Sequence, residues 1–281
     1  MSSAAGLAKS VRIPPRPEVL VAISNEVNSE TPDIDRVVCA IKKDVTLYGA
    51  ILRLVNSPAI GFAGVKTIDR AIMLLGLKRI AQLAQVTVLQ NQLGAAMRLN
   101  RFWDTAAEVA EITSLLASKF TGLSTEDAYT VGMFHDYGVP LMMQSFPDYK
   151  ELLMEANQNP VMDLVEEETN RYGFNHYDVG FELGKIWLVP DHLNQAIRFQ
   201  PQLDDMFANK IVIDDSDTVK TLLALLDMAK NISGTHRKFW RSKDETAALG
   251  VSPLALNFLD MDAADYLELR DEILHKLRDG K

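Results

Sequence analysis

The sequence predicts an all-α fold. Apolar residues recur at the three- and four-residue spacings of amphipathic helices along most of the 281 residues. Sustained alternation of apolar and polar residues, the pattern of a half-buried strand, does not appear, and the segment KIVIDD (210–215) comes nearest to it. The composition, 47% hydrophobic and 24% charged, is typical of a globular chain with a substantial core.

Local signals place the first helices. Pro17 stands near the start of a helix in RPEVLVAISNEVN, because proline suits the first helical turn. Asp33 and Asp44 are predicted to cap the next two helices, IDRVVCAIKK and VTLYGAILRLVNS. Thr67 precedes the short helix IDRAIMLLGL, which Gly76 closes.

Helical patterns continue to the end of the chain. A helix through KRIAQLAQVTVLQNQL is followed by a long helix over about 101–119. The residues STED (124–127) form a capping signal that opens another helix. Further helices are predicted at 147–157, 160–172, 176–187, 191–200, 216–233 and 262–278.

The net charge and the cysteine content limit the cellular compartment and the binding partners that we expect. The formal net charge is -9 and the pI is near 5.1, so neither DNA nor RNA is an expected partner. No apolar run approaches the ~20 residues of a membrane span, and residues 1–17 lack the apolar core of a signal peptide. The one cysteine, Cys39, is expected on the buried side of its helix, and such sparse use indicates the reducing cytoplasm.

Familiar catalytic motifs are missing from the sequence. It has no nucleophile elbow, phosphate-binding loop, dinucleotide-binding fingerprint or Cys-x-x-Cys pair. The acidic run EEE (166–168) is predicted to be a solvated helix face. Three of the five histidines, His192, His236 and His275, have polar neighbours and are expected at the surface. Two tryptophans are expected to anchor the core between helices, namely Trp103 and Trp187.

One apolar segment, VGMFHDYGVPLMM (131–143), carries His135 next to Asp136. Polar side chains of this kind are seldom buried without a partner or a function. An imidazole and a carboxylate on a buried helix can form half of a site for a divalent metal ion. The remaining ligands would have to come from other parts of the chain.

Six motifs follow one another along residues 11–212: IPPRPEVL, KDVTLYGAILRLVNSPAIGF, IDRAIMLLGLKRI, FWDTAAEVAEI, VGMFHDYG and HYDVGFELGKIWLVPDHLNQAIR. Together they resemble the HDOD domain, the HD-related output domain of bacterial signalling proteins. The resemblance implies a helical bundle, about 11–98, packed against a degenerate relative of the HD phosphohydrolase core, about 99–212. The C-terminal helices of 213–281 are expected to complete that core. The role implied is that of a non-catalytic interaction or output module.

The resemblance also assigns positions to the metal ligands of active HD enzymes. Those enzymes use a first histidine, the His-Asp doublet and a late aspartate. The matching positions hold Thr105, then His135 with Asp136, then Lys230. The doublet is therefore present, while the first and last ligands are replaced.

The HD-GYP branch of the same superfamily adds a lysine after the doublet, a further histidine and a His-His pair. The resemblance places Val139, His176 and the dipeptide Phe199-Gln200 at those positions. Of these ligands only His176 remains. A buried histidine of this kind is interpreted first as a satisfied core group and second as a ligand.

Helical spacing predicts that these positions share one interior. Thr105 lies in an apolar stripe of its helix, and His135 lies on an apolar face of a helix through 131–143. Lys230 follows Leu222 and Leu226 along an apolar face. A buried lysine needs a partner, so its amine is predicted within ~4 Å of Asp136, in the volume a metal ion would fill.

Two functional hypotheses remain open. One is a signalling module without cofactor or chemistry of its own, in which His135 and Asp136 are a hydrogen-bonded relic or line a small-molecule pocket. The other is a metal-dependent phosphohydrolase acting on a phosphate ester or nucleotide, with a divalent ion on His135 and Asp136. The expected partners are other signalling proteins. The loop NSPAIGFAGVK (56–66), with Phe62, is either the partner surface or a plain connector.

Overall fold

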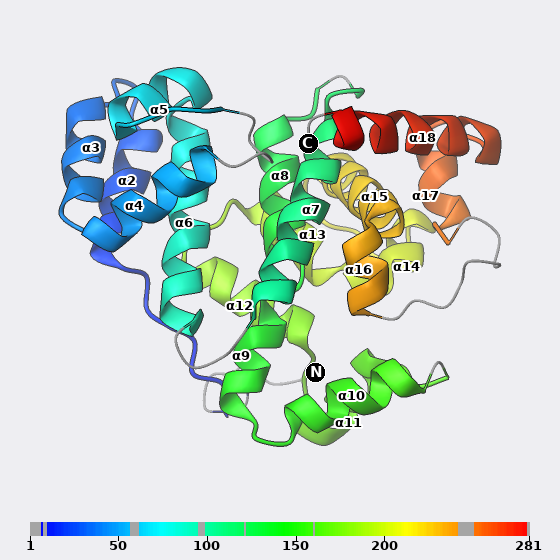
Figure 1. Cartoon of the computed structure of the whole chain (residues 1–281). Helices are drawn as coiled ribbons and strands as arrows, with labels where there is room; N and C mark the ends of the chain where they lie inside the picture. The colour runs from blue at the N-terminus through cyan, green and yellow to red at the C-terminus, as the bar shows by residue number, and fades with distance from the viewer. Residues whose placement is uncertain are drawn as a thin grey trace. The chain divides into compact units, whose positions relative to one another are not determined.

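The chain is helical, and the described part of it contains no strand (Figure 1). The computed structural model describes Leu7 and residues 10–56, 62–94, 99–120, 122–159, 161–240 and 250–279. Residues 210–215, the nearest approach to a strand in the sequence, form a bend and a turn. The all-α prediction is confirmed.

The chain divides into two compact units. One unit contains residues 15–98 together with 277–281, and the other contains residues 1–14 together with 99–276. No single helix in the described part of the chain is long and apolar enough to cross a membrane, although the bent pair Ile68–Leu75 and Leu77–Gln92 meets that test jointly.

The described part of the unit of residues 15–98 is built from five helices, and three of them start at the predicted capping residues. The side chains of Asp33, Asp44 and Thr67 each accept a hydrogen bond from a backbone N–H in the first turn that follows. Gly76 ends the fourth helix with a φ of 81°, a conformation that favours glycine. The helices are α2 (Glu18–Val27), α3 (Ile34–Lys42), α4 (Val45–Val55), α5 (Ile68–Leu75) and α6 (Leu77–Gly94).

Cys39 is exposed on α3, so its predicted burial is wrong. The residues of α3 that face the core are Val37, Val38 and Ile41. Position 39 falls outside that stripe, because neighbours in a helical stripe are three or four residues apart.

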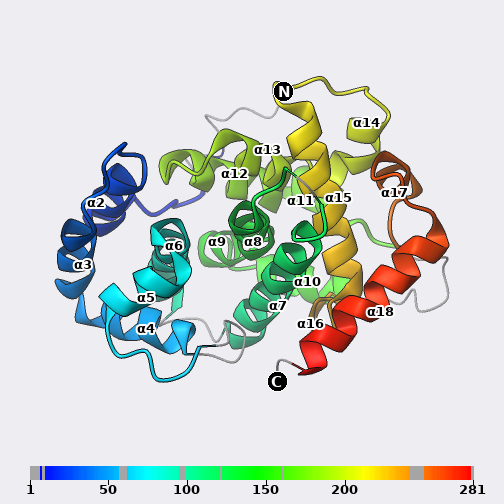
Figure 2. The same ribbon diagram turned by 90° about the horizontal axis from the view of Figure 1, so that it is seen from above.

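The second unit holds the His-Asp doublet. Its helices are α7 (Asn100–Ala117), α8 (Thr125–Phe134), α9 (Gly138–Ser145), α10 (Tyr149–Gln158), α11 (Leu164–Tyr172), α12 (His176–Ile186), α13 (Asp191–Arg198), η1 (Gln200–Gln202), α14 (Leu203–Phe207), α15 (Ser216–Ile232), α16 (Gly234–Phe239), α17 (Pro253–Phe258) and most of α18 (Ala263–Asp279). Figure 2 shows α7, α8 and α15 as neighbouring helices.

Helices α7 and α8 pack closely because Gly132 lacks a side chain. A Cβ placed there would lie 2.6 Å from the Ala110 Cα of α7. Trp187 is fully buried, as predicted, and its indole N–H donates to the carbonyl oxygen of Pro14 at 3.0 Å. Trp103 is only partly buried, with its ring edge-on to Tyr137.

The segment 131–143 is not one helix. Helix α8 ends at Phe134 and α9 begins at Gly138, so the His-Asp doublet lies in the turn between them. Pro140 explains the break, because it has no N–H to give the Asp136 carbonyl and a continuous helix would need that bond. Val139 N donates to the Asp136 carbonyl instead, at 2.9 Å.

Gly138 brings the start of α9 against the start of α12. A Cβ on Gly138 would clash with the carbonyl oxygen of His176. The two histidine-bearing segments therefore meet backbone to backbone, which fixes how far apart their side chains lie.

Candidate metal centre

His135 is buried and held in one orientation. Its side chain is 2% exposed, and its Nδ1 lies 2.6 Å from the Gly132 carbonyl oxygen. A carbonyl oxygen can only accept, so Nδ1 carries the proton and donates. The Nε2 atom lies 3.2 Å from Asp136 Oδ2 but has no hydrogen-bond partner among the described residues. Nδ1 is thus engaged, and Nε2 is the ring atom that faces this carboxylate.

Asp136 is also buried, and only one of its two oxygens is satisfied. Oδ2 accepts a hydrogen bond from the Trp240 indole at 3.0 Å, while Oδ1 has no partner among the described residues. Burial by itself would raise the pKa of Asp136, but His135, and more weakly Lys230 and His176, lower that pKa below its ordinary value. The carboxylate is therefore ionised in the interior.

His236 completes a group of three, and its predicted surface position is wrong. The residue is 8% exposed, and the ligand atoms of His135, Asp136 and His236 all lie within 4.8 Å of one another. Burial, followed by the charges of Lys230 and His135, holds the pKa of His236 well below its ordinary value. Its ring is therefore neutral near pH 7, and Nε2 has no partner in the described chain.

The burial of His236 was not predicted because its neighbours in the sequence are polar. The short helix α16 turns one side chain inward, while Arg237 and Lys238 remain exposed. Ser233 accepts a hydrogen bond from His236 N at 3.0 Å and so starts the helix. In the sequence NISGTHRKFW, the capping residue Ser233 was the one signal that a helix carrying His236 begins there.

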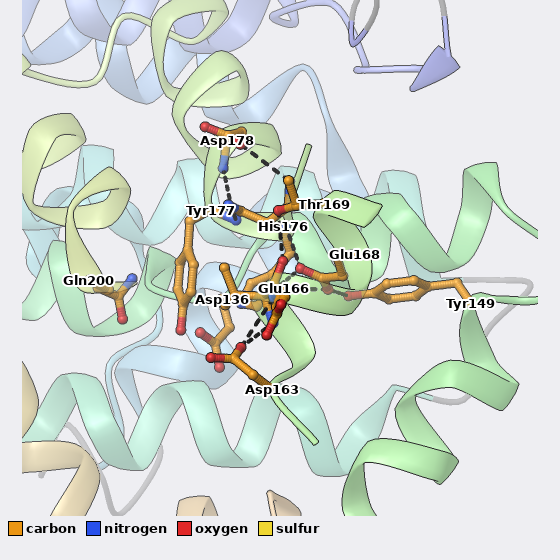
Figure 3. Close-up of polar contacts among 12 residues, drawn as sticks. Asp136, Tyr149, Asp163, Glu166, Glu168, Thr169, His176, Tyr177, Asp178 and Gln200 are labelled. Carbon is orange, nitrogen blue, oxygen red and sulfur yellow. Dashed lines mark hydrogen bonds and ion pairs between the residues drawn. The ribbon is translucent and has the colours of Figure 1, made fainter. Parts of the chain in front are cut away.

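His176 lies at the start of α12 and is held by Glu168 of α11. Its Nδ1 is 2.7 Å from Glu168 Oε2, and its backbone N–H donates to the same oxygen at 3.0 Å. The Tyr149 hydroxyl donates to Glu168 Oε1. Figure 3 shows Tyr149 and His176 reaching Glu168 from opposite sides. Burial alone would lower the pKa of His176, but Glu168 raises it above the ordinary value.

The expectation of a solvated acidic face at 166–168 is wrong for Glu168, which is 0% exposed. Glu168 lies four residues after Leu164 and four before Tyr172, on the inward face of α11. That spacing could have separated it from the exposed Glu166.

Lys230 does not form the predicted ion pair with Asp136. Its amine donates to Gln200 Oε1 at 3.2 Å, and no ion pair within 4.0 Å joins it to Asp136 in the described chain. Gln200 in turn donates to the His135 carbonyl oxygen at 2.8 Å. The amide of Gln200 holds the lysine, and the Trp240 indole already occupies Asp136 Oδ2. The lysine still acts on Asp136 through its charge.

A cavity of about 190 Å³ opens beside these residues. The polar groups that line it include Asp136, His176, Lys230 and His236, with Trp240 alongside. Thr105 is buried on α7, as the stripe predicts, but the cavity is lined by other residues. The structure thus brings His135, Asp136, His176, Gln200 and Lys230 into one neighbourhood and adds His236.

The residues present fit a divalent metal ion. Two imidazoles and one carboxylate are a common ligand set, and the Nε2 and Oδ1 atoms have no hydrogen-bond partner among the described residues. The hydrogen bond from His135 Nδ1 to a carbonyl is the kind of outer contact that orients ligating histidines. The ligand set is not that of active HD enzymes, because Thr105 and Lys230 contribute nothing to it.

Comparisons with known proteins agree with the fold. The HDOD domain model matches residues 13–203. An uncharacterized protein of Treponema pallidum is 26% identical over 203 residues, and the matched part is 68% of this chain but 38% of that protein. A solved structure from Shewanella amazonensis, provisionally named a phosphohydrolase, has a TM-score of 0.65 and 22% identity, covering 97% of this chain and 100% of its own. One from Marinobacter aquaeolei, provisionally named a signal transduction protein, has a TM-score of 0.71 and 19% identity, covering 98% and 62%.

Proposed function

The chain belongs to the HDOD family, and from this premise we propose that it is a bacterial signalling module that binds other proteins and does not turn over a phosphate ester. The observation that carries the proposal is Lys230. Its ammonium lines the cavity at the position where active HD enzymes place their late aspartate. A lysine there cannot supply the metal ligand that the late aspartate gives in active HD enzymes, so the ligand set that phosphoester hydrolysis uses is incomplete.

The hydrogen bonds around Lys230 support the same proposal. Gln200 links the lysine to the backbone of His135, so the doublet, η1 and α15 are joined by one chain of contacts. Such a chain stiffens the core. A stiff helical core suits a module that presents a surface to a partner.

A second candidate function, metal-dependent phosphohydrolase, is favoured by one observation, the group of His135, Asp136 and His236. A metal ion held there would polarise a phosphoryl oxygen and activate a water molecule. Within the chain, Lys230 would bind a phosphate oxygen, and Glu168 would keep the ring of His176 directed at the cavity.

Turnover assays separate the two candidates. The purified full chain is tested with generic phosphoesters, cyclic dinucleotides and nucleoside phosphates in the presence of Mn²⁺, Fe²⁺, Mg²⁺ or Zn²⁺. We expect rates at background. Turnover that disappears in His135→Ala and Asp136→Ala, and persists in the control His275→Ala on the exposed face of α18, would overturn the signalling proposal.

The partner surface of the proposed module is the loop around Phe62. Residues 57–61 of this loop lie outside the described residues, and Phe62 itself is partly buried. Capture of proteins from a cell extract should weaken in Phe62→Ala and stay unchanged in Met73→Ala, a control in the same unit that is 76% exposed. Unchanged capture by a stable Phe62→Ala variant would place the surface elsewhere.

A further inference from the structure

Three buried side chains from two separate segments converge beside the cavity. We propose that the chain binds one first-row transition-metal ion, of the Zn²⁺ or Fe²⁺ class, through His135 Nε2, Asp136 Oδ1 and His236 Nε2. The third ligand comes from α16, a helix that supplies none of the ligand positions implied by the sequence resemblance. The three residues are those of the second candidate function, and the proposal adds the ligand atoms and the class of ion. It concerns binding alone and does not depend on turnover.

The separations fit a metal shell. One ligand atom from each of His135, Asp136 and His236 lies within 4.8 Å of the other two. Bonds of about 2.0–2.2 Å from zinc to nitrogen or oxygen hold ligand atoms roughly 3–4 Å apart. Side-chain movements that bring these atoms about 1–2 Å closer together therefore suffice to close the shell.

The hydrogen bonding of these residues leaves the binding atoms unused. His135 Nε2, Asp136 Oδ1 and His236 Nε2 are buried and lack hydrogen-bond partners within the described residues. Buried polar atoms without partners are uncommon and costly, and three of them in one place call for a common cause. One cation satisfies all three lone pairs at once, which the Lys230 amine does not do, because it is bonded to Gln200.

The remaining atoms of the same side chains are already engaged in orienting the ligands. His135 Nδ1 donates to the Gly132 carbonyl, so Nε2 is the ring atom left to bind an ion. Trp240 donates to Asp136 Oδ2 and so turns Oδ1 away from the indole. This arrangement of outer contacts around ligating groups is typical of protein metal sites.

The donor set selects the class of ion. Two imidazoles and one carboxylate suit Fe²⁺, Co²⁺, Ni²⁺ and Zn²⁺, whereas Mg²⁺ prefers a shell of oxygens. The cavity beside Asp136 and His236 leaves room for water in the open coordination position. Lys230 lines this cavity as well, so its charge weakens the binding of any cation.

Cobalt titration tests the proposal without an activity assay. The full chain is stripped with chelator, and Co²⁺ is added while visible absorption and melting temperature are followed. We expect one ion per chain, d–d bands of a site with nitrogen ligands, and a raised melting temperature, with Zn²⁺ displacing Co²⁺ and Mg²⁺ without effect. Binding should weaken about tenfold or more in His236→Gln and stay unchanged in the control His275→Ala.

Lys230→Met provides a second measurement that does not depend on loss of folding. Removing the positive charge should tighten Co²⁺ binding severalfold, because a like charge no longer opposes the ion. The proposal is overturned if the wild type takes up no stoichiometric Co²⁺, or if His236→Gln binds it as tightly as the wild type.

The metal titration and the turnover assays test the two proposals separately. Stoichiometric metal without turnover supports both proposals, and turnover with metal overturns only the signalling one. Absence of bound metal overturns the metal site and leaves the signalling module intact.

Discussion

Two buried acid–histidine pairs lie in the same unit, and they differ in how completely they are satisfied. Both oxygens of Glu168 have partners, in Tyr149 and in the ring and backbone of His176. Asp136 has one oxygen without a partner in the described chain, while Nε2 is unpartnered in both His135 and His176. A carboxylate with both oxygens bonded, as in the saturated pair of Glu168 and His176, holds helices together, while a carboxylate with an unpartnered oxygen is available for binding.

Removing the carboxylate of the saturated pair should have the largest effect on the free energy of unfolding. Glu168→Ala removes the acceptor for Tyr149 and for two groups of His176, so the free energy of unfolding should fall by about 3–5 kcal/mol. Glu166→Ala on the exposed side of the same helix should change it by less than about 1 kcal/mol. Urea denaturation of both variants measures the difference, and similar losses in the two would contradict the structural role of Glu168.

Separating the two acid–histidine pairs should lower the free energy of unfolding by less than the loss of Glu168. Gly138→Ala places a methyl group against the His176 carbonyl, and overpacking of this kind costs about 1–3 kcal/mol. Gly49→Ala is the matched control, because no atom lies within 4 Å of a Cβ at that helical position. The control should be neutral or slightly stabilising. Equal melting temperatures for Gly138→Ala and the wild type would show that the close approach of α9 and α12 is not required.

The saturated pair should also have its own pH dependence. The pKa of His176 is raised by Glu168, so the native protein holds a proton that the unfolded chain releases at lower pH. Stability from the pair is therefore fully present below the ordinary histidine pKa of ~6.5 and is lost as pH rises through the raised value. The stability advantage of the wild type over Glu168→Gln should therefore shrink as the pH rises from below ~6.5 through the raised pKa of His176. An advantage that is constant with pH would mean that His176 is neutral throughout.

The smallest effect on the free energy of unfolding is expected at Lys230, beside the pair of His135 and Asp136. Lys230→Ala should lower the free energy of unfolding by about 1 kcal/mol, because it removes a hydrogen bond to Gln200 from a partly exposed side chain. A loss of about 3–5 kcal/mol, the cost of breaking a buried ion pair, would instead indicate that Lys230 forms a direct ion pair with Asp136. Chemical denaturation at neutral pH distinguishes the two values.

Local signals in the sequence predicted the helices well. Asp33, Asp44, Thr67 and Ser124 cap the helices they were expected to cap, since a cap depends on contacts within one turn. Periodicity placed Thr105 in the core for the same reason. These features are encoded within a few neighbouring residues.

The composition of the site depended on contacts that periodicity cannot describe. His236 lies on a six-residue helix, too short for a stripe to show which side is buried. Glu168 is buried because Tyr149 and His176, distant in sequence, satisfy its charge. Lys230 was placed correctly on an apolar face, but its partner could not be identified, because Gln200 and Trp240 compete for the positions around it.

The hydrogen bond between the Trp187 indole and the Pro14 carbonyl has a consequence for the order of folding during synthesis. The two residues are 173 positions apart, and residues 1–14 belong to the same unit as residues 99–276. The segment that ends at Pro14 leaves the ribosome before residues 15–98, yet its indole partner is made much later. Residues 15–98 are complete well before then, and domains generally fold as units while the chain emerges. Pro14 therefore precedes residues 15–98 in synthesis but reaches its native contact with Trp187 after they are complete.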